Sequence, residues 1–273
     1  MKQHKLLNLA TIAALSATVF AGAPTVFAED GQVREITTEG DITFVEGSGD
    51  EPIEVEPPVD PEEPIIIPPV EPETNRGPLT IAYVPNISFG ERAISAYDQE
   101  YNAIAPEFAM ESGEGTLPYI HFAQVQDTRG TYAGWDLTVS LTEFTNSEAS
   151  TVNKTLRGAQ LNFKNGLATN NGLSEQLATA PDNVTLRPGQ EATNLLSASE
   201  GKGAGIQSIY WGELDALNTV EVTDEEGEII DTYAENPSVT LDVPGATEKD
   251  QAQYTATLTW NLTAGVANEN PED

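Results

Sequence analysis

Histidine and cysteine most often carry catalysis or hold transition metals, and this sequence contains almost none of either. The 273 residues include no cysteine and two histidines. His4 lies in a segment that we expect to be cleaved, and His121 lies inside a predicted strand, where a lone histidine is more often structural than a ligand. Neither a Ser-His-Asp set nor a zinc site of the common types is therefore supported. We expect no catalytic residue, no metal and no cofactor.

Carboxylates are the abundant reactive groups, with 44 Asp and Glu residues. So many acids make any acid–base pair easy to propose and impossible to select without geometry. The acidic run at residues 224–228 lacks the one-three-five spacing of a calcium loop, so a solvated turn is the simpler interpretation. The Gly-Lys-Gly-Ala-Gly run at residues 201–205 lacks the spacing of a phosphate loop. We therefore predict that the protein is not an enzyme.

The formal net charge of −32 argues against two classes of anionic partner, nucleic acids and anionic membranes. A chain this acidic should not bind nucleic acid through phosphates, and an anionic membrane should repel it. Solubility is the simplest role for the charge.

Two stretches with strict alternation indicate the elements around which the fold is built. Residues 254–263 place Tyr254, Trp260 and Leu262 on one face, with threonine and asparagine on the other. Residues 134–141 repeat the pattern with Trp135 and Leu137. Such alternation is typical of half-buried strands, and we expect these two strands to form two major walls of one β core.

The tryptophans permit two interpretations. A tryptophan on the inward face of a sandwich is normally core, and the unbroken alternation favours this role for Trp135 and Trp260. Alternatively, exposed tryptophans stack on sugar rings. That role needs an aromatic surface open to solvent, for which Trp211 or Tyr210 is better placed.

The N-terminal third is predicted to lie outside the fold. Residues 1–28 combine two lysines, an apolar run and a small-x-small pattern, as in a cleaved signal peptide, so no transmembrane segment should remain. Removing two lysines and no acid leaves a charge of about −34. Residues 29–78 are rich in proline and glutamate, which predicts a disordered or extended linker. Within it, residues 65–67 could add a short strand to a sheet edge.

Residues 79–268 are predicted to form a single β domain, followed by a flexible tail at 269–273. Short strands separated by Gly, Asn and Pro turns predict an all-β, antiparallel sandwich. Residues 91–115 and 164–181 are expected to be loops with at most a helical turn. Asp127 and Arg129 are expected to stabilise a turn.

The strand motifs resemble the WxL-domain cell-surface proteins of Gram-positive bacteria. The resemblance rests on Leu258-Thr-Trp260-x-Leu262 preceded by Tyr254, on Asp127-Thr-Arg-Gly followed by Trp135-x-Leu137, and on the opening around Leu79. It covers about residues 79–266. Val266 stands where the family pattern usually has proline, which puts the C-terminal exit turn in doubt but not the fold.

The resemblance implies non-covalent attachment to the cell wall with peptidoglycan as ligand, and no enzymatic activity. It also implies possible complexes with other WxL-type surface proteins and with a membrane-anchored partner. The alternative is a structural subunit retained at the wall only through protein partners. The predicted location is secreted, at the cell wall or cell surface.

Overall fold

The computed structural model describes residues 38–48, 53–70, 75–224 and 226–265, so the predicted signal peptide and tail lie outside the described residues. The chain divides into two units, Met1–Thr43 and Phe44–Asp273. Of the first unit only residues 38–43 are described, and they form no helix or strand. Every described strand belongs to the second unit.

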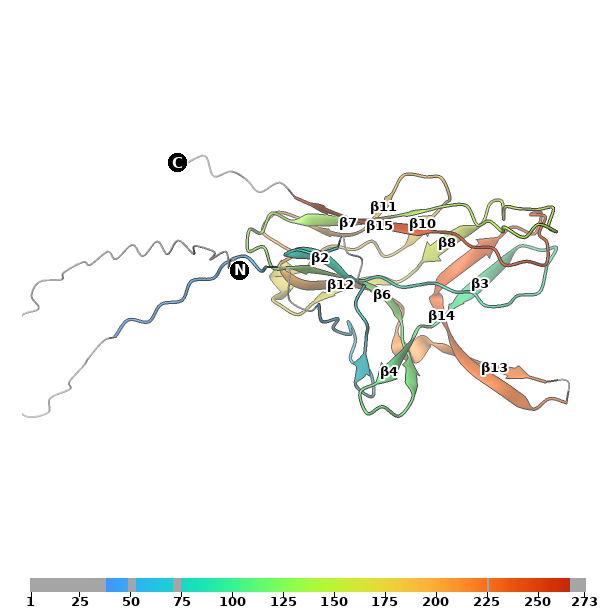
Figure 1. Cartoon of the computed structure of the whole chain (residues 1–273), viewed down its shortest axis with the longest axis horizontal. Coiled ribbons are helices and arrows are strands. Elements are labelled where there is room, and N and C mark those ends of the chain that lie inside the picture. The colour runs from blue at the N-terminus through green and yellow to red at the C-terminus, as the bar shows by residue number, and fades with distance from the viewer. Residues whose placement is uncertain (1–37, 49–52, 71–74, 225, 266–273) are drawn as a thin grey trace, which may run out of the picture. The chain divides into compact units, whose positions relative to one another are not determined.

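The second unit is all β, as predicted, and its strands pair antiparallel throughout. Two sheets stack as a sandwich, with β7 and β15 above β2, β6 and β12 in Figure 1. The upper sheet has the order β11 (Thr193–Ala198), β7 (Trp135–Leu141), β15 (Leu258–Ala264). The lower sheet has the order β2 (Leu79–Tyr83), β6 (His121–Asp127), β12 (Gly205–Trp211), β9 (Gly166–Asn170).

Two further sheets and two helical turns complete the unit. One sheet has the order β10 (Val184–Leu186), β8 (Gln160–Phe163), β14 (Ile229–Val243), β13 (Asn218–Thr223), with β3 (Gln99–Ile104) also on β14. The other has the order β1 (Ile65–Ile66), β4 (Glu107–Met110), β5 (Thr116–Pro118). The 3₁₀ turns are η1 (Ser174–Gln176) and η2 (Leu214–Ala216).

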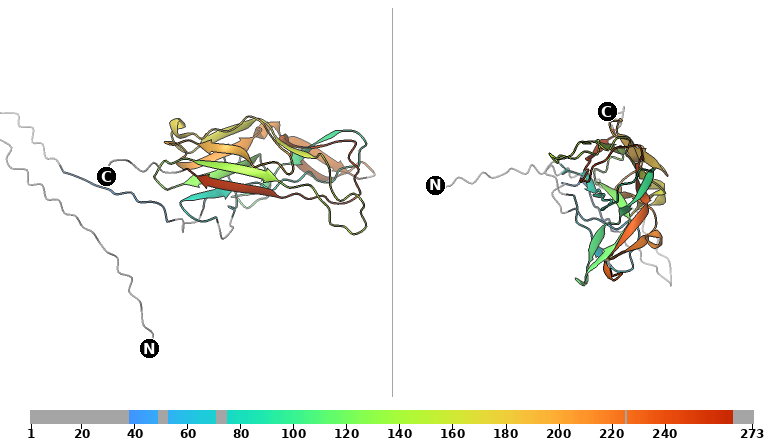
Figure 2. Two further views of the ribbon diagram at one scale, coloured as in Figure 1. Left: turned by 90° about the horizontal axis from the view of Figure 1, so that it is seen from above. Right: turned by 90° about the vertical axis from the view of Figure 1, so that its right-hand side faces the viewer.

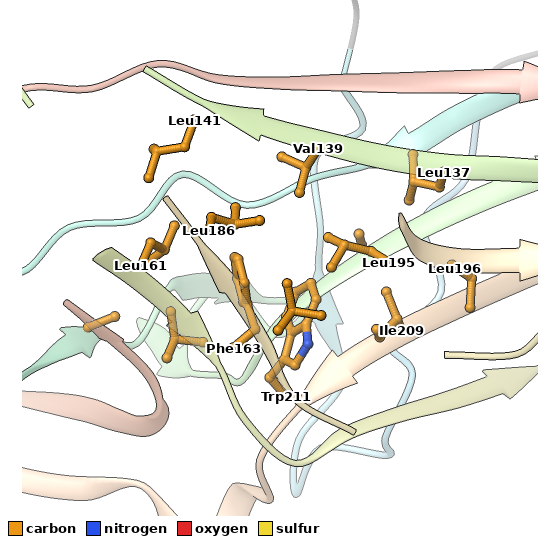
Figure 3. Packing of buried hydrophobic residues seen from close by; sticks show 14 of the residues in the cluster. Leu137, Val139, Leu141, Leu161, Phe163, Leu186, Leu195, Leu196, Ile209 and Trp211 are labelled. Carbon is orange, nitrogen blue, oxygen red and sulfur yellow. The ribbon is translucent and has the colours of Figure 1, made fainter. Parts of the chain in front are cut away.

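The main core lies between the sandwich sheets and continues toward β8 and β10 (Figure 3). Its upper side is the inward row of β7, in which Leu137 and Val139 are fully buried. Trp211 from the lower sheet packs against Phe163, with ring centroids 4.3 Å apart. Large aromatic side chains that bury this much area dominate the energetics of such a core.

The two Trp-x-Leu strands are neighbours in one sheet, which corrects the expectation that they form two separate walls. β7 and β15 pair with Leu137 opposite Leu262 and Val139 opposite Trp260. Because directly opposed residues share a face, both motifs point to the same side of the upper sheet. The second wall of the sandwich comes from β6 and β12.

Part of the predicted linker contacts the domain. Residues 53–70, here called the strap, place Val55, Val59, Ile65 and Ile67 against a second apolar cluster. Residues 65–67 were expected to be able to add a short strand to a sheet edge, and Ile65–Ile66 do pair with β4. The acidic residues of the strap are exposed, so it alternates between apolar contact and solvated charge.

Two predicted loops contain strands, which corrects both predictions. Residues 91–115 include β3 and β4, and residues 164–181 include β9. These strands carry polar or small residues, such as Gln99-Glu100 and Ala168-Thr169-Asn170, so the pattern of apolar residues did not mark them. β3 is held by pairing with the long strand β14 and β9 by pairing with β12, whereas β4 lies between the short strands β1 and β5.

Candidate binding sites

Three of the six predicted site residues are core. Trp135 is 1% exposed and its indole Nε1 donates to the Gly203 carbonyl oxygen at 3.0 Å. Leu137 and Trp211 are buried as well. Trp211 therefore presents no ring face to solvent, contrary to the expectation above, and the neighbouring Tyr210 is half-buried against the second apolar cluster.

A glycine makes the Trp135 contact possible. Gly203 has φ of +83°, and a Cβ added there would lie 2.7 Å from Trp135 Nε1 and 2.2 Å from Ala198 Cβ. A side chain would therefore clash and would also strain the backbone. The Gly-Lys-Gly-Ala-Gly run, which lacks the spacing of a phosphate loop, thus provides the backbone against which Trp135 packs and to which it donates a hydrogen bond.

The second motif lies at the surface. Trp260 and Leu262 are half-buried, and they line a groove of about 690 Å³ together with Leu79 and Ile81 of β2. The charged residues among its described lining residues are Arg76 and Arg129, and none is acidic. In a chain with 44 acidic residues, this groove is a local departure from the overall charge.

Arg129 at the end of that groove is held in place by the predicted turn, which the structure confirms. Its guanidinium contacts Asp127 through Nε at 2.9 Å and Nη2 at 2.7 Å, and Nη2 also donates to the Gly134 carbonyl oxygen. The hydrogen bonds to Asp127 raise the pKa of Arg129. This bidentate pair ties the loop before β7 to the end of β6.

A second pocket, which we call the tyrosine pocket, has a volume of about 340 Å³ and is lined by Tyr254 together with Tyr101, Phe89, Arg92 and Gln253. Tyr101 is half-buried, and the Arg92 guanidinium carbon lies 5.7 Å from its ring centroid. Arg92 also pairs with Glu235 at 2.6 Å. The pocket therefore offers aromatic rings beside fixed polar groups, a composition that suits a small polar ligand.

Hydrogen bonds fix the wall of the tyrosine pocket around Tyr254. Its hydroxyl donates to the Asn153 carbonyl oxygen at 2.7 Å and accepts from the Asp250 backbone N–H at 3.0 Å. The Asp250 carboxylate in turn accepts from Asn153 N–H at 2.8 Å, and these bonds to Asn153 lower the pKa of Asp250. The Tyr254 hydroxyl is thus engaged within the protein, and its ring is held in place in the pocket wall.

The predicted site residues therefore separate into three places. Trp135, Leu137 and Trp211 are core, Trp260 and Leu262 line the groove, and Tyr254 lines the tyrosine pocket. Tyr101 and Arg92 were missed, because residues 91–115 carried no clear strand signal. Over the described part of the chain, no group of three or more His, Asp or Glu side chains is arranged to hold a metal ion.

The fold and these sites define an all-β domain with ligand-sized surface pockets. The chain matches the family described as "WxL domain surface cell wall-binding" over residues 31–265, and it belongs to that family. This places it among cell wall-binding surface domains. No curated protein and no solved structure matches the chain. No helix among the described residues is long and apolar enough to cross a membrane.

Proposed function

We propose that this protein attaches non-covalently to the cell wall by binding peptidoglycan, and that the tyrosine pocket takes part of the glycan. The family match supports wall binding. The pocket supports a glycan because half-buried Tyr101 and Tyr254 line it with polar side chains around them. Aromatic rings cover the apolar face of a sugar, and fixed polar groups bond its hydroxyls.

The charges around the pocket favour an uncharged part of the glycan. Arg92 is engaged by Glu235, and the Lys249 ammonium donates to the Ser95 and Thr247 carbonyl oxygens at 3.0 and 2.9 Å. These cations hold the pocket wall together and are not free to bind a polyanion. Recognition therefore rests on stacking and hydrogen bonds, consistent with a net charge that opposes anionic wall polymers.

A second candidate function is that of a structural subunit, retained at the wall by other WxL-type proteins or by a membrane-anchored partner. The open groove beside Trp260 favours a protein contact, because it lies along the edge strand β15. The two functions differ in whether the isolated chain binds bare wall.

A sedimentation experiment tests the proposal. The expected mature chain, residues 29–273, is mixed with purified peptidoglycan, with and without its attached wall polymers. Tyr101→Leu removes the ring but keeps an apolar side chain on β3, and it should raise the Kd for peptidoglycan, read from the pelleted fraction over a concentration series, by about tenfold, the loss of a contact worth about 1.4 kcal/mol. Tyr97→Leu is the matched control, because Tyr97 is 80% exposed and does not line the pocket.

Circular dichroism of each variant confirms that the fold is retained. If the wild type stays in the supernatant, wall attachment depends on a protein partner and the proposal fails. If the wild type pellets and both variants pellet equally well, peptidoglycan binds at another surface.

A further inference from the structure

The edge of β15 is an unpaired row of backbone groups. In the described structure β15 pairs with β7 and with no other strand. Thr257 and Gly265, two residues of the same parity, bond to β7 through Thr142 N–H to Thr257 O and Gly265 N–H to Gly134 O. Because bonding sides alternate along an antiparallel strand, the N–H and C=O groups of Leu258, Trp260 and Leu262 point away from β7.

Other edges of the sandwich are covered. The free side of β2 is bonded by the Asn75 side chain, which accepts from Ile81 N–H at 2.9 Å and donates to Ile81 O at 2.6 Å. The free side of β11 is bridged by Thr179, which bonds Ser197 in both directions. Among the residues that the structure describes, β15 has no such cover, and its own seven residues include no charge, no proline and no bulge. Folded proteins normally protect long edges of this kind.

The layer below β15 is also left partly uncovered by the described part of the chain. The upper sheet has three strands and the lower sheet four, and β2 lies beyond the edge of β15 in the left view of Figure 2. Leu79 and Ile81 belong to the face of β2 that meets the core, yet they are only half-buried, whereas Thr80 and Ala82 on the other face are buried. The inward face of β2 is therefore only partly covered, and one more strand beside β15 in the upper sheet would cover it.

The groove occupies this place. Its lining runs along β15 from Leu258 to Leu262 and along β2 from Leu79 to Ile81. A volume of about 690 Å³ holds a short extended peptide. A whole sheet edge from another domain would bring its own second layer into the space that the lower sheet fills.

The chain itself contains a segment that alternates like a strand but pairs with no described strand. Residues 41–45 read Asp-Ile-Thr-Phe-Val and form no strand, and Ile42, Phe44 and Val45 are 75%, 85% and 86% exposed. The family match includes this segment. Its alternation would place Ile42 and Phe44 over β2, with Thr43 outward beside the outward row Thr259, Asn261 and Thr263 of β15.

We propose that β15 accepts residues 41–45 of a second copy as a fourth strand of the upper sheet. The donated backbone pairs with Leu258, Trp260 and Leu262, and the donated Ile42 and Phe44 side chains cover Leu79, Ile81 and the exposed part of Trp260. This is strand addition, in which backbone bonds supply affinity and alternate side chains supply specificity.

Donor and acceptor are different surfaces of the same chain, so the contact is heterologous. Each copy gives one strand and receives one, so such contacts either close, as a reciprocal dimer or a larger ring, or propagate into a linear assembly. The inference does not depend on the tyrosine pocket or on glycan binding.

The absence of cysteine permits a direct test. Two single-cysteine chains are made, Thr43→Cys in the donor segment and Asn261→Cys on the outward face of β15, each with a different affinity tag. They are mixed, oxidised and purified through both tags in turn. We expect about tenfold more cross-linked heterodimer than for Thr43→Cys mixed with Thr219→Cys, an exposed position on β13, because only the former pair is brought together.

Two added substitutions locate the contact. Phe44→Asp in the donor chain places a carboxylate over the apolar side chains of Leu79, Ile81 and Trp260, and it should return cross-linking to the level of the control pair. Leu262→Pro in the acceptor removes an N–H that points away from β7, so the β7 ladder keeps its bonds while the donated strand loses one. Thermal unfolding shows that each variant is folded.

The proposal is overturned if the Thr43 and Asn261 pair links no better than the control pair. It is also overturned if a chain carrying both cysteines closes only on itself, because the segment then serves its own copy. Cross-linking that survives Phe44→Asp places the contact elsewhere. Wall sedimentation of the same variants separates this result from the proposed function, since a failed cross-link leaves glycan binding untouched.

Discussion

Trp135 and Trp260 have the same sequence context but different surroundings. Trp135 lies on β7, the central strand of its sheet, and its indole N–H is bonded to Gly203. Trp260 lies on β15, the edge strand, and is only half-buried. The two motif residues should therefore differ in what they contribute to the free energy of unfolding.

Replacing each tryptophan by alanine should show this difference. Trp135→Ala removes a fully buried ring and leaves the Gly203 carbonyl oxygen unpaired, so we expect a loss of about 3–5 kcal/mol. Trp260→Ala removes less buried area and should cost about half as much. Urea unfolding of both variants measures the difference. Equal losses would show that the edge tryptophan is as well packed as the central one.

His121 is a buried base in a chain of acids. Its side chain is fully buried, and Asn236 Nδ2 lies 3.2 Å from Nδ1. An amide N–H only donates, so Nδ1 accepts and the ring proton sits on Nε2, which has no hydrogen-bond partner among the described residues. Burial lowers the pKa of His121 to about 3.

The sign of the resulting pH dependence follows from this pKa. Between pH 6.5 and pH 3 the unfolded chain binds a proton at His121 and the folded chain does not, so stability falls as the pH falls. Relative to His121→Phe, the wild type should lose about 1.4 kcal/mol per pH unit across this window. Urea unfolding of both chains from pH 7 to pH 4 measures the difference, in which the shared carboxylates cancel. A constant difference would contradict a buried neutral histidine.

At the scale of elements, the strap is held by side chains that imitate a strand. The Gln124 amide, which is fully buried, accepts from Glu56 N–H at 3.2 Å and donates to Glu56 O at 2.7 Å. The buried Tyr119 hydroxyl accepts from Val59 N–H at 3.0 Å and donates to Val59 O. Two side chains thus satisfy both backbone groups of two strap residues, and apolar contacts at Ile65 and Ile67 add to them.

Gln124→Leu should release the first part of the strap while preserving the sandwich. The two bonds to Glu56 are lost, together with the bond from Gln124 Nε2 to Ser208 Oγ on β12, and a buried apolar side chain of similar size remains. Hydrogen exchange at residues 53–59 should therefore rise by about tenfold, equivalent to about 1.4 kcal/mol of local stability. Exchange of β7, which makes no hydrogen bond to Gln124, serves as the internal reference. Unchanged exchange in the strap would mean that the apolar contacts alone hold it.

Regular alternation made the central elements predictable from sequence. β6, β7 and β15 were all expected, because each alternates or runs apolar over several residues. β3, β4 and β9 were not, since their pairing partners hold them despite polar or small residues. The position of each tryptophan was also beyond the pattern, because alternation gives the face of a strand but not its place in the sheet. The strap was hidden by its proline and glutamate content, although its few apolar residues are the ones that make contact.

At the scale of the whole molecule, net charge sets the response to salt. With a formal charge of −32, the protein is repelled at long range by anionic wall polymers. Added salt screens this repulsion. Binding to wall that retains its polymers should therefore strengthen or stay unchanged as salt rises, and the same holds as the pH falls within the range where the fold is stable. Sedimentation across a salt series measures it, and binding abolished by moderate salt would show that ion pairs drive attachment.

The pairing of β7 with β15 also determines when the sandwich can close. Asn261 contacts Thr138, 123 residues earlier in the chain. As the chain emerges from its N-terminal end, all four strands of the lower sheet and two strands of the upper sheet, β7 and β11, appear before β15. The upper sheet must therefore wait with one side of β7 unpaired until residues 258–264 have emerged. Contacts this distant in sequence form slowly. The sandwich therefore remains open until residues 258–264 are available, and β15 is the strand that completes the upper sheet.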